Sequence, residues 1–550
     1  MSSGGLTNIA AHLPEMARRQ PDTPAIHIPA GSGRYHTYSF KQLDQESDWI
    51  AHGLESIGIV RGVRTALMVT PGLEFFALTF ALFKVGAVPI MIDPGIGMKN
   101  LKVCLAEAEP EAFIGIPKAH IARLLFGWGK KSLKVLLTVG SKLFWGGVSL
   151  KSLKRRVADG QSYPVVQTAA EETAAILFTS GSTGVPKGVV YTHGNFIAQV
   201  EALQQVYDIQ PGEIDLPTFP LFALFAPALG MSSVVPVMDF TRPGSVDPKN
   251  IIDPIQHFNI TTMFGSPALI NRVGRYGEEH GVKLPSLKRA ISAGAPVPAV
   301  VLQRFTKMLN EDVQIFTPYG ATESLPVCSI GSHEILNDTR HATDAGQGVC
   351  VGRPAPGIKL EIIKTTDHPI DWWNDDFVLP DGEIGEIVVS GPQVTRRYFN
   401  RKESTDLAKI SDPPNALFYH RMGDLGYRDG QGRIWFCGRK AHRVICADRT
   451  LYTIPCEAIF NTHPSVFRSA LVGIGNPGKM QPVMCVELEQ GIEKSQQPQI
   501  LLELKLIGQQ HELTRSIEQI LFHPSFPVDI RHNAKIFREQ LAVWAQEQIR

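Results

Sequence analysis

The sequence lacks an excess of charge of either sign. It contains 54 Lys and Arg residues against 53 Asp and Glu residues, which leaves a net charge of +1. A chain this close to neutral has no global attraction for nucleic acid or for anionic substrates. Hydrophobic residues make up 43% and charged residues 19%, as in an ordinary globular protein.

Cysteine is also scarce. The seven cysteines are scattered, odd in number and never arranged as C-x-x-C. This pattern excludes a disulfide framework and a structural zinc site, and it predicts reduced thiols in the cytosol. The first residues show no basic region followed by an apolar core, so we expect no signal peptide and a cytoplasmic location.

One apolar run is long enough to suggest a membrane span. Residues 216–238 carry no charge and are bracketed by Asp215 and Asp239. Four prolines interrupt the run: Pro217, Pro220, Pro227 and Pro236. They would remove too many backbone hydrogen bonds from a single helix. We therefore predict a buried strand, turn and helix instead of a span.

The chain is too long for a single hydrophobic core. Its 550 residues suit two or three domains. Up to about residue 436, helical patterns alternate with short β-branched runs at 64–69, 87–92, 112–116 and 135–139. This alternation predicts an α/β fold with doubly wound sheet layers.

The pattern changes after Gly438. Residues 451–490 mix strands with a short helix, residues 490–499 are polar and expected to be flexible, and a final helix starts near Phe537. We place a domain boundary here, between residues 1–437 and 438–550.

Residues 179–188 form the most informative segment. They combine three glycines, four hydroxyl groups and one lysine, directly after the apolar run 174–178. The Walker pattern is excluded, because Pro186 precedes Lys187 and Gly188 follows it. A flexible surface loop is the alternative. The lysine, the proline and the preceding strand favour a loop that wraps a polyphosphate.

Further motifs follow one another along the chain. Residues 82–94 read L-F-K-V-G-A-V-P-I-M-I-D-P. Later come S-A-G-A-P (292–296), Y-G-A-T-E (319–323), G-E-I-G-E-I-V-V-S-G (382–391), R-M-G-D (421–424), C-G-R (437–439) and N-A-K-I-F-R (533–538). With T-S-G-S-T-G-V-P-K-G, this series resembles the AMP-forming adenylating enzymes, which include acyl-CoA synthetases, luciferases and the adenylation domains of peptide synthetases. The resemblance spans nearly the whole chain.

The resemblance implies a fold and a chemistry. It implies a large N-terminal domain of doubly wound sheet layers with a distorted β-barrel, and a small mobile C-terminal α+β domain. ATP and Mg²⁺ are the implied cofactors: a carboxylate attacks the α-phosphate and pyrophosphate leaves. The run 216–238 would lie on the acyl side of the site.

The resemblance also assigns the residues that hold the phosphates. The β- and γ-phosphates would be bound by Thr179, Ser180, Gly181, Ser182, Thr183, Gly184 and Lys187. Thr322 would contact the α-phosphate. Glu323 would bind Mg²⁺, although by itself it is equally typical of a solvated loop acid.

The nucleoside and the catalytic lysine are assigned in the same way. Asp424 would accept hydrogen bonds from both ribose hydroxyls, with Arg439 close to ribose or phosphate. Adenine would stack on Tyr319, and the wall residues would include Gly320, Gly294 and Ala295. Lys535 would bridge the carboxylate and the α-phosphate. Ala534 precedes it where the family usually has glycine, and a solvated basic helix start is the alternative reading.

Departures from the family pattern concern the step after adenylation, in which the acyl group leaves AMP. Ala441 stands where the family usually has the Asp or Lys of the hinge between the domains. Residues 444–448 lack the Lys and Gly with which thioester-forming members line the pantetheine tunnel, and Ala223 stands where the family has a histidine. Segments 218–225, 437–440 and 451–464 resemble the branch that makes β-lactones in bacterial long-chain olefin biosynthesis. The branch implies a long-chain β-hydroxy acid substrate whose own hydroxyl closes the ring; the alternative is a long-chain fatty acyl-CoA ligase. His193 is a candidate base for the hydroxyl, although a histidine at this position is more often structural.

Residues 123–156 carry nine Lys or Arg and no acid, interleaved with apolar and aromatic side chains. Such a segment is typical of a surface that contacts an anionic membrane or partner enzymes of the same pathway. A solvated helical face is the alternative. Nucleic acid is disfavoured by the near-neutral chain and by the adenylating motifs.

Overall fold

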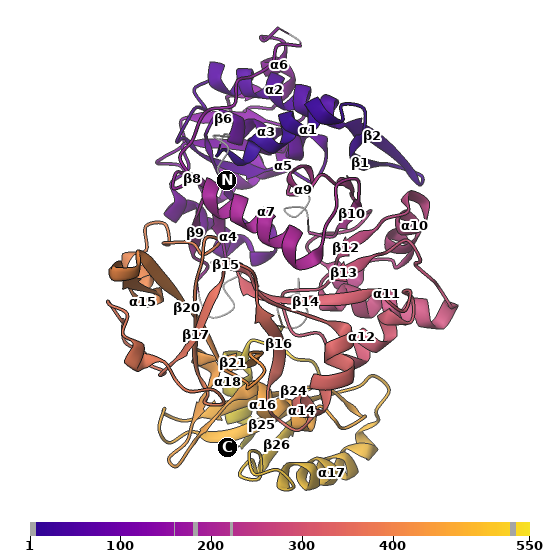
Figure 1. Ribbon diagram of the computed structural model, residues 1–550, viewed down its shortest axis with the longest axis vertical. Helices are drawn as coiled ribbons and strands as arrows, with labels where there is room; N and C mark the ends of the chain where they lie inside the picture. Colours follow the sequence, from indigo (N-terminus) through magenta and orange to yellow (C-terminus); the bar gives the residue numbers. More distant parts are fainter. Residues whose placement is uncertain (1–6, 159, 180–184, 220–223, 529–534, 550) are drawn as a thin grey trace.

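The computed structural model describes residues 7–158, 160–179, 185–219, 224–528 and 535–549, and Figure 1 shows their arrangement. Their strands form a large sheet, a seven-stranded sheet and two small sheets. The predicted α/β fold with layered sheets is confirmed.

The seven-stranded sheet carries the phosphate-loop candidate. Its strands, in spatial order, are β7 (Val148–Ser149), β6 (Val135–Thr138), β5 (Ala112–Gly115), β3 (Arg64–Met68), β4 (Val88–Met91), β8 (Thr173–Phe178) and β9 (Gly188–Thr192). All neighbours are parallel except β8 and β9. Helices α2 (Phe40–Ser56) and α3 (Leu73–Lys84) pack together, and α3 is buried along most of its length. The four predicted strand runs all appear in this sheet.

The large sheet joins a parallel half to an antiparallel half. The parallel half contains β1 (Pro24–Gly31), β11 (Ser232–Val234), β10 (Ile214–Pro217), β12 (Thr262–Phe264), β13 (Arg289–Ile291) and β14 (Gln314–Ala321), with β2 (Arg34–Ser39) antiparallel at the edge. The antiparallel half contains β15 (Ser324–Gly331), β16 (Val349–Pro354), β21 (Ile434–Arg439), β20 (Leu417–Arg428), β18 (Gly385–Ser390), β17 (Lys359–Ile363) and β19 (Lys409–Asp412). The antiparallel strands therefore continue the large sheet, and no separate barrel sheet is found among the described residues.

Helices cover the sheets and the connections between them. Those of the first 437 residues not yet given are α1 (His12–Arg19), α4 (Met98–Ala108), α5 (Pro117–Phe126), α6 (Leu150–Lys154), α7 (His193–Tyr207), α9 (Ala226–Leu229), α10 (Lys249–Phe258), α11 (Pro267–His280), α12 (Ala299–Thr306), α13 (Ser332–Glu334), α14 (Arg340–Asp344) and α15 (Lys402–Ala408). Buried side chains of α10, α11 and α12 form one core cluster with the parallel half of the large sheet.

The apolar run 216–238 is not a single helix. It contains the end of β10, the four-residue helix α9 and β11. Within the described ranges, no helix has both the length and the apolar character needed to cross a membrane. The prediction of a buried strand, turn and helix agrees with these elements.

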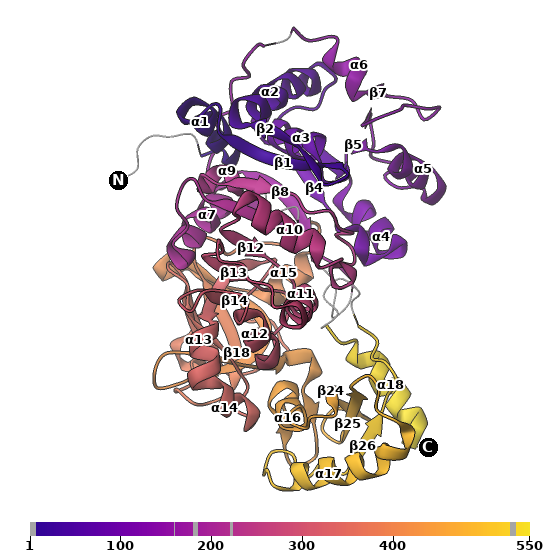
Figure 2. The same cartoon turned by 90° about the vertical axis from the view of Figure 1, so that its right-hand side faces the viewer.

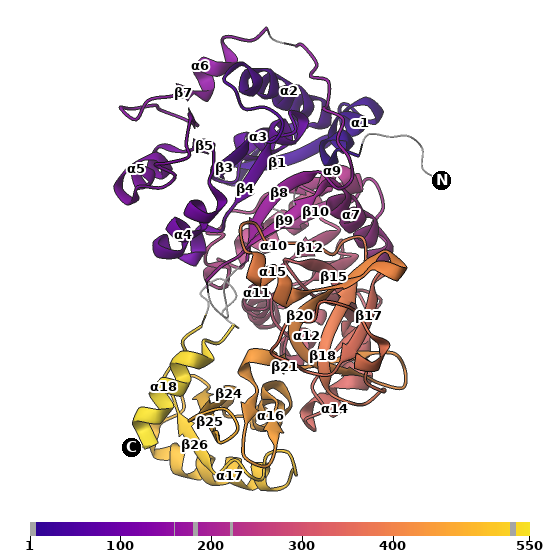
Figure 3. The same cartoon turned by 90° about the vertical axis from the view of Figure 1, so that its left-hand side faces the viewer.

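Residues 444–549 form a part with its own cores. A three-stranded sheet of β24 (Val466–Ile474), β25 (Gln481–Leu488) and β26 (Gln519–Phe522) packs with α16 (Thr453–Phe460), α17 (Gln497–Gln509) and α18 (Arg538–Ile549). A short hairpin joins β22 (Val444–Ile445) to β23 (Thr450–Leu451). Figures 2 and 3 show this yellow part at the end of the molecule opposite α2 and α6.

Two details in this part differ from the sequence predictions. The segment 490–499, expected to be flexible, runs into the first turn of α17. The final helix begins at Arg538, one residue after the predicted start. The boundary placed between 437 and 438 falls inside β21, and the division into two domains stays a prediction.

Candidate active site

The phosphate-loop candidate connects two paired strands. Phe178 at the end of β8 lies opposite Gly188 at the start of β9. The Thr179 N–H donates to the Lys187 carbonyl at 3.1 Å, and the Lys187 N–H donates to Thr179 Oγ1 at 3.1 Å. These bonds hold the two ends of the loop together. Some predicted residues lie outside the described part of the chain: Ser180, Gly181, Ser182, Thr183 and Gly184.

Tyr398 joins the phosphate-loop lysine to the predicted metal ligand. Segment 397–399 pairs with β9 through backbone hydrogen bonds of 3.2 and 2.7 Å. Lys187 Nζ lies 5.0 Å from the centroid of the Tyr398 ring. The Tyr398 hydroxyl donates to Glu323 Oε1 at 2.6 Å. Burial raises the pKa of Tyr398, so the phenol remains a neutral donor.

The turn between β14 and β15 carries Thr322 and Glu323. The Thr322 carbonyl accepts a hydrogen bond from the Tyr191 hydroxyl at 2.5 Å. The Glu323 carbonyl accepts from the Thr395 N–H at 2.9 Å and from Thr395 Oγ1 at 3.1 Å. Three bonds from two other segments therefore fix the backbone that presents the Glu323 carboxylate.

Arg439 and Tyr319 contact the buried carboxylate of Asp424 and form a polar group with it. Asp424 on β20 lies opposite Arg439 on β21, with Arg439 Nη1 3.0 Å from Asp424 Oδ1. The Tyr319 hydroxyl donates to Asp424 Oδ2 at 2.7 Å. Burial raises the pKa of Asp424, while Arg439 and Tyr319 oppose that shift. Asp424 Oδ1 is buried and is held by the ion pair with Arg439, and a carboxylate has further acceptor sites that a ligand hydroxyl could use.

The residues around Glu323 and those around Asp424 share one electrostatic environment. The negative charge of Glu323 raises the pKa of Asp424, and the same charge raises the pKa of Arg439. Electrostatic coupling of this kind requires the groups to lie near one another in a poorly solvated region. The structure thus brings Lys187, Glu323, Asp424 and Arg439 together.

The predicted adenine walls lie at one edge of the large sheet. β13 and β14 are parallel, so the loop after β13, with Gly294 and Ala295, emerges at the same edge as Tyr319 near the end of β14. Ligands of open α/β sheets bind at the carboxyl ends of the strands. Gly294 has a φ of +101°, and a Cβ on Gly320 would come within 2.7 Å of the Ser324 carbonyl oxygen. Glycine is required at both positions.

Lys535 lies just before α18, in a segment bonded to the loop after β26 and to α16. The Phe537 N–H donates to the Pro527 carbonyl at 2.9 Å. Arg538 Nη2 donates to both carboxylate oxygens of Glu457 on α16, at 2.6 and 2.7 Å. The position of Lys535 therefore depends on a buried ion pair three residues further on.

His193 is not among the residues that meet at Glu323 and Asp424. It begins α7, and its Nδ1 accepts a hydrogen bond from the Ile9 N–H at 3.2 Å. The five residues of β9 separate it from the loop, which corresponds to about 17 Å of extended chain. Burial lowers the pKa of His193 to about 4, so the ring is neutral and holds the N-terminal segment.

Two buried basic residues near Glu323 were missed by the sequence analysis. Lys409 lies opposite His420 in the β19–β20 pair, and Lys409 Nζ donates to the Thr395 carbonyl. Burial lowers the pKa of Lys409 to about 7, although Glu323 opposes the shift. Burial and the nearby Lys409 and Lys187 lower the pKa of His420 well below its usual value. No local pattern marks these residues, because their partners come from distant segments.

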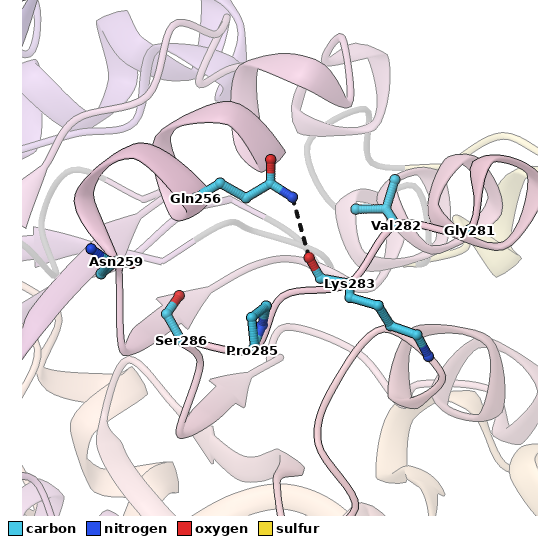
Figure 4. Close-up of a pocket in the computed structure, with 7 residues that line it drawn as sticks. All are labelled: Gln256, Asn259, Gly281, Val282, Lys283, Pro285 and Ser286. Atoms are coloured by element: carbon cyan, nitrogen blue, oxygen red, sulfur yellow. Dashed lines mark hydrogen bonds between the residues drawn. The ribbon is translucent and has the colours of Figure 1, made fainter.

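A separate surface hollow has no part in this group. It has a volume of about 660 Å³ and lies between α10 and the loop after α11. Figure 4 shows its lining residues, with Gln256 Nε2 donating to the Lys283 carbonyl at 3.2 Å. None of the predicted site residues lines it.

The sequence of this chain is similar to a protein family and to two proteins of known function. Residues 13–399 match the family model described as AMP-binding enzyme. The chain is 50% identical to the olefin beta-lactone synthetase of Xanthomonas campestris pv. campestris, over 99% of this chain and 98% of that protein. It is also 50% identical to the olefin beta-lactone synthetase of Stenotrophomonas maltophilia, over 98% of each chain.

Solved structures show the same fold. The amide bond synthetase McbA from Marinactinospora thermotolerans superposes with a TM-score of 0.78 at 21% identity, over 98% of this chain and 100% of that chain. At this level of identity the likeness concerns the fold and not the substrate.

Proposed function

Because this chain belongs to the AMP-binding enzyme family, we propose that it adenylates a long-chain β-hydroxy acid with ATP and then closes the product to a β-lactone. The observation that carries the proposal is the 50% identity to two olefin beta-lactone synthetases along nearly the entire chain. The 2-alkyl-3-hydroxy acids of olefin biosynthesis are the proposed substrates. The enzyme is thus an AMP-forming ligase.

The buried group at Asp424 fits a nucleoside. The Asp424 carboxylate would accept a hydrogen bond from a ribose hydroxyl, and the Arg439 ion pair would favour its charged form. Tyr319, whose hydroxyl is tied to Asp424, would present its ring to adenine against Gly294 and Ala295.

The Glu323 group fits the phosphates. Lys187 supplies a cation beside Tyr398, and Thr322 lies next to Glu323 on the fixed turn. Glu323 is the residue that would hold Mg²⁺, completing the ion's shell with phosphate oxygens and water. Among the described residues no group of three or more His, Cys, Asp or Glu side chains could hold a metal by itself, and a single carboxylate suits a metal delivered with ATP. Bound there, Mg²⁺ would offset the charge of the departing pyrophosphate.

The first half-reaction transfers the adenylyl group of ATP to the carboxylate of the acid. A carboxylate oxygen of the acid attacks the α-phosphorus and forms a new P–O bond. The bond from the α-phosphorus to the oxygen that bridges to the β-phosphate breaks, and pyrophosphate leaves with its electron pair. Lys535 would stabilise the charge shared between the carboxylate and the α-phosphate. We propose that residues 438–550 act as a lid that carries Lys535 to the nucleotide.

The second half-reaction is intramolecular. The β-hydroxyl oxygen attacks the adenylate carbonyl carbon, the hydroxyl proton is released, and AMP leaves as the four-membered ring closes. Because nucleophile and electrophile belong to one molecule, the step needs no acceptor thiol and gains from proximity.

The rival reading is a long-chain fatty acyl-CoA ligase. In such enzymes the segment that aligns with residues 444–448 would line a pantetheine tunnel. Here these residues form part of the β22–β23 hairpin, whose tip closes with a 2.9 Å bond from the Cys446 N–H to the Arg449 carbonyl. No glycine lies between Val444 and Leu451 to let a thin ligand approach the backbone. This local structure favours the lactone.

A mass-resolved product assay tests the proposal. Purified protein receives ATP, Mg²⁺ and a long-chain β-hydroxy acid, with or without CoA. We expect AMP, pyrophosphate and a product lighter than the acid by one water, independent of CoA. A thioester formed only when CoA is present would refute the lactone and support the ligase.

A further inference from the structure

Helix α5 presents an apolar stripe to solvent. Its outward side chains Ile121, Leu124 and Leu125 are 40%, 45% and 76% exposed, and Phe126 at its end is 41% exposed. Positions 121, 124 and 125 follow the i, i+3, i+4 spacing of one helix face. A helix normally turns such a face inward, so this stripe has no partner within the described protein.

A second apolar protrusion lies beside the first. Leu143 and Phe144, just before β7, are 52% and 81% exposed. Trp145 next to them stacks on His120 of α5, with ring centroids 5.2 Å apart and planes 3° from parallel. This contact joins the two segments, and Figures 2 and 3 show α5 and β7 together at the outer edge of the molecule.

Cations surround these protrusions. Residues 123–156 contain nine Lys or Arg and no Asp or Glu. Two of the nine are paired with acids from elsewhere: Lys134 with Glu111 at 3.2 Å, and Lys154 with Glu46. The exposed cations of this region that make no ion pair with any described residue are Lys118, Lys130, Lys131, Lys142, Lys151, Arg155 and Arg156.

We propose that this surface, formed by α5 and residues 127–156, docks on the face of an anionic phospholipid bilayer. Side chains such as Leu125 and Phe144 would enter the boundary between headgroups and acyl chains, while the lysines contact the headgroups. Each cation near an anionic leaflet adds attraction that falls off within a Debye length. Nucleic acid would use the cations but leave the aliphatic stripe exposed to water, which disfavours it.

The inference rests on the surface and not on the lactone chemistry. The long acyl chain of the proposed substrate gives the enzyme a reason to work at a membrane. Docking and product formation can fail separately, because the docking surface contains none of the residues assigned to the nucleotide.

Vesicle sedimentation tests the proposal. The full-length protein is mixed with vesicles of phosphatidylcholine alone, or of phosphatidylcholine with phosphatidylglycerol. We expect pelleting with the anionic vesicles only, and release at 1 M salt. The double variant Leu125→Ser/Phe144→Ser should lose affinity about tenfold or more, because two large apolar contacts with the bilayer are removed.

A matched control comes from the other end of the molecule. Leu502 and Leu506 on α17 are 53% and 51% exposed, so Leu502→Ser/Leu506→Ser also removes two exposed apolar side chains, but outside the proposed surface. This variant should pellet like the wild type, and both variants should retain adenylation in detergent-free buffer. Equal sedimentation with and without anionic vesicles would overturn the proposal. Unchanged vesicle binding of Leu125→Ser/Phe144→Ser would overturn it as well.

Discussion

The ion pair between Glu457 and Arg538 offers a sharp test of how the C-terminal part holds Lys535, the proposed catalytic lysine. Arg538 makes two bonds of 2.6 and 2.7 Å to the Glu457 carboxylate, and the Leu471 N–H donates to Glu457 Oε1 at 2.8 Å. The side chains are 12% and 6% exposed. Burial raises the pKa of Glu457, and Arg538 opposes that shift. This contact ties α16, β24 and the start of α18 together.

The change Glu457→Gln keeps the shape of the side chain and removes its charge. An amide can still accept from Leu471, but the Arg538 charge is left buried without a counter-ion. Breaking a buried pair in this way costs about 3 kcal/mol. That energy corresponds to an increase of about a hundredfold in the equilibrium constant for opening of the local structure. Lys535 lies three residues before Arg538, so adenylation should slow while ATP binding remains.

Hydrogen exchange measured by mass spectrometry gives the local stability. Peptides from residues 453–474 and 538–549 should exchange about a hundredfold faster in the variant. A matched control is Glu512→Gln, which breaks the Glu512–Arg515 pair with side chains 83% and 56% exposed. Such a surface pair contributes less than about 1 kcal/mol, so exchange should change little.

A double variant measures the interaction between Glu457 and Arg538 separately from their other contacts. Glu457→Gln/Arg538→Gln removes both charges, and it should be less destabilised than the sum of the two single variants. Exchange in Glu457→Gln at the wild-type rate would show that the pair does not hold this segment. Additive effects in the double variant would show that the two side chains do not interact, and either result would refute the reasoning.

Three further predictions concern the site and the fold. Lys535→Ala should abolish acyl-adenylate formation, while ATP binding measured by calorimetry is retained. The control Lys505→Ala on α17 should leave both unchanged. Activity of Lys535→Ala near the wild-type level would contradict the assignment. Asp424→Asn should weaken ATP binding about tenfold to a hundredfold, because charged hydrogen bonds to ribose are lost and Arg439 is left without its counter-charge; an unchanged ATP dissociation constant would contradict this. Asp215 is buried and its pKa is raised to about 7, so its contribution to stability is present below about pH 4 and is lost as pH rises through 7. Asp215→Asn should therefore unfold at a higher temperature than the wild type at pH 8 but not at pH 4, and a difference independent of pH would exclude this role.

Several features of the fold could be read from local patterns. The runs 64–69, 87–92, 112–116 and 135–139 became β3, β4, β5 and β6, because buried parallel strands need continuous apolar side chains. Prolines in 216–238 ruled out a span for the same local reason, the loss of backbone donors.

Other features depend on partners that no local pattern names. Tyr398 meets Glu323 across 75 residues, and Arg538 meets Glu457 across 81. His193 shows the converse: it is close to the phosphate loop in sequence, yet β9 carries it away. Lys84, inside the motif 82–94, is fully buried against Asp44 and Asp48, at 2.6 and 2.5 Å, and so stabilises the fold.

The sequence by itself determined the family, the order of the motifs and the residue types for each step, because backbone propensity, apolar periodicity and loop composition are local properties. The tertiary structure alone decided which carboxylates are buried, which donors satisfy them and how their pKa values shift. Burial and pKa shifts depend on desolvation and on charges that strand pairing brings within a few ångströms. The separation of two residues along the sequence does not reveal either effect.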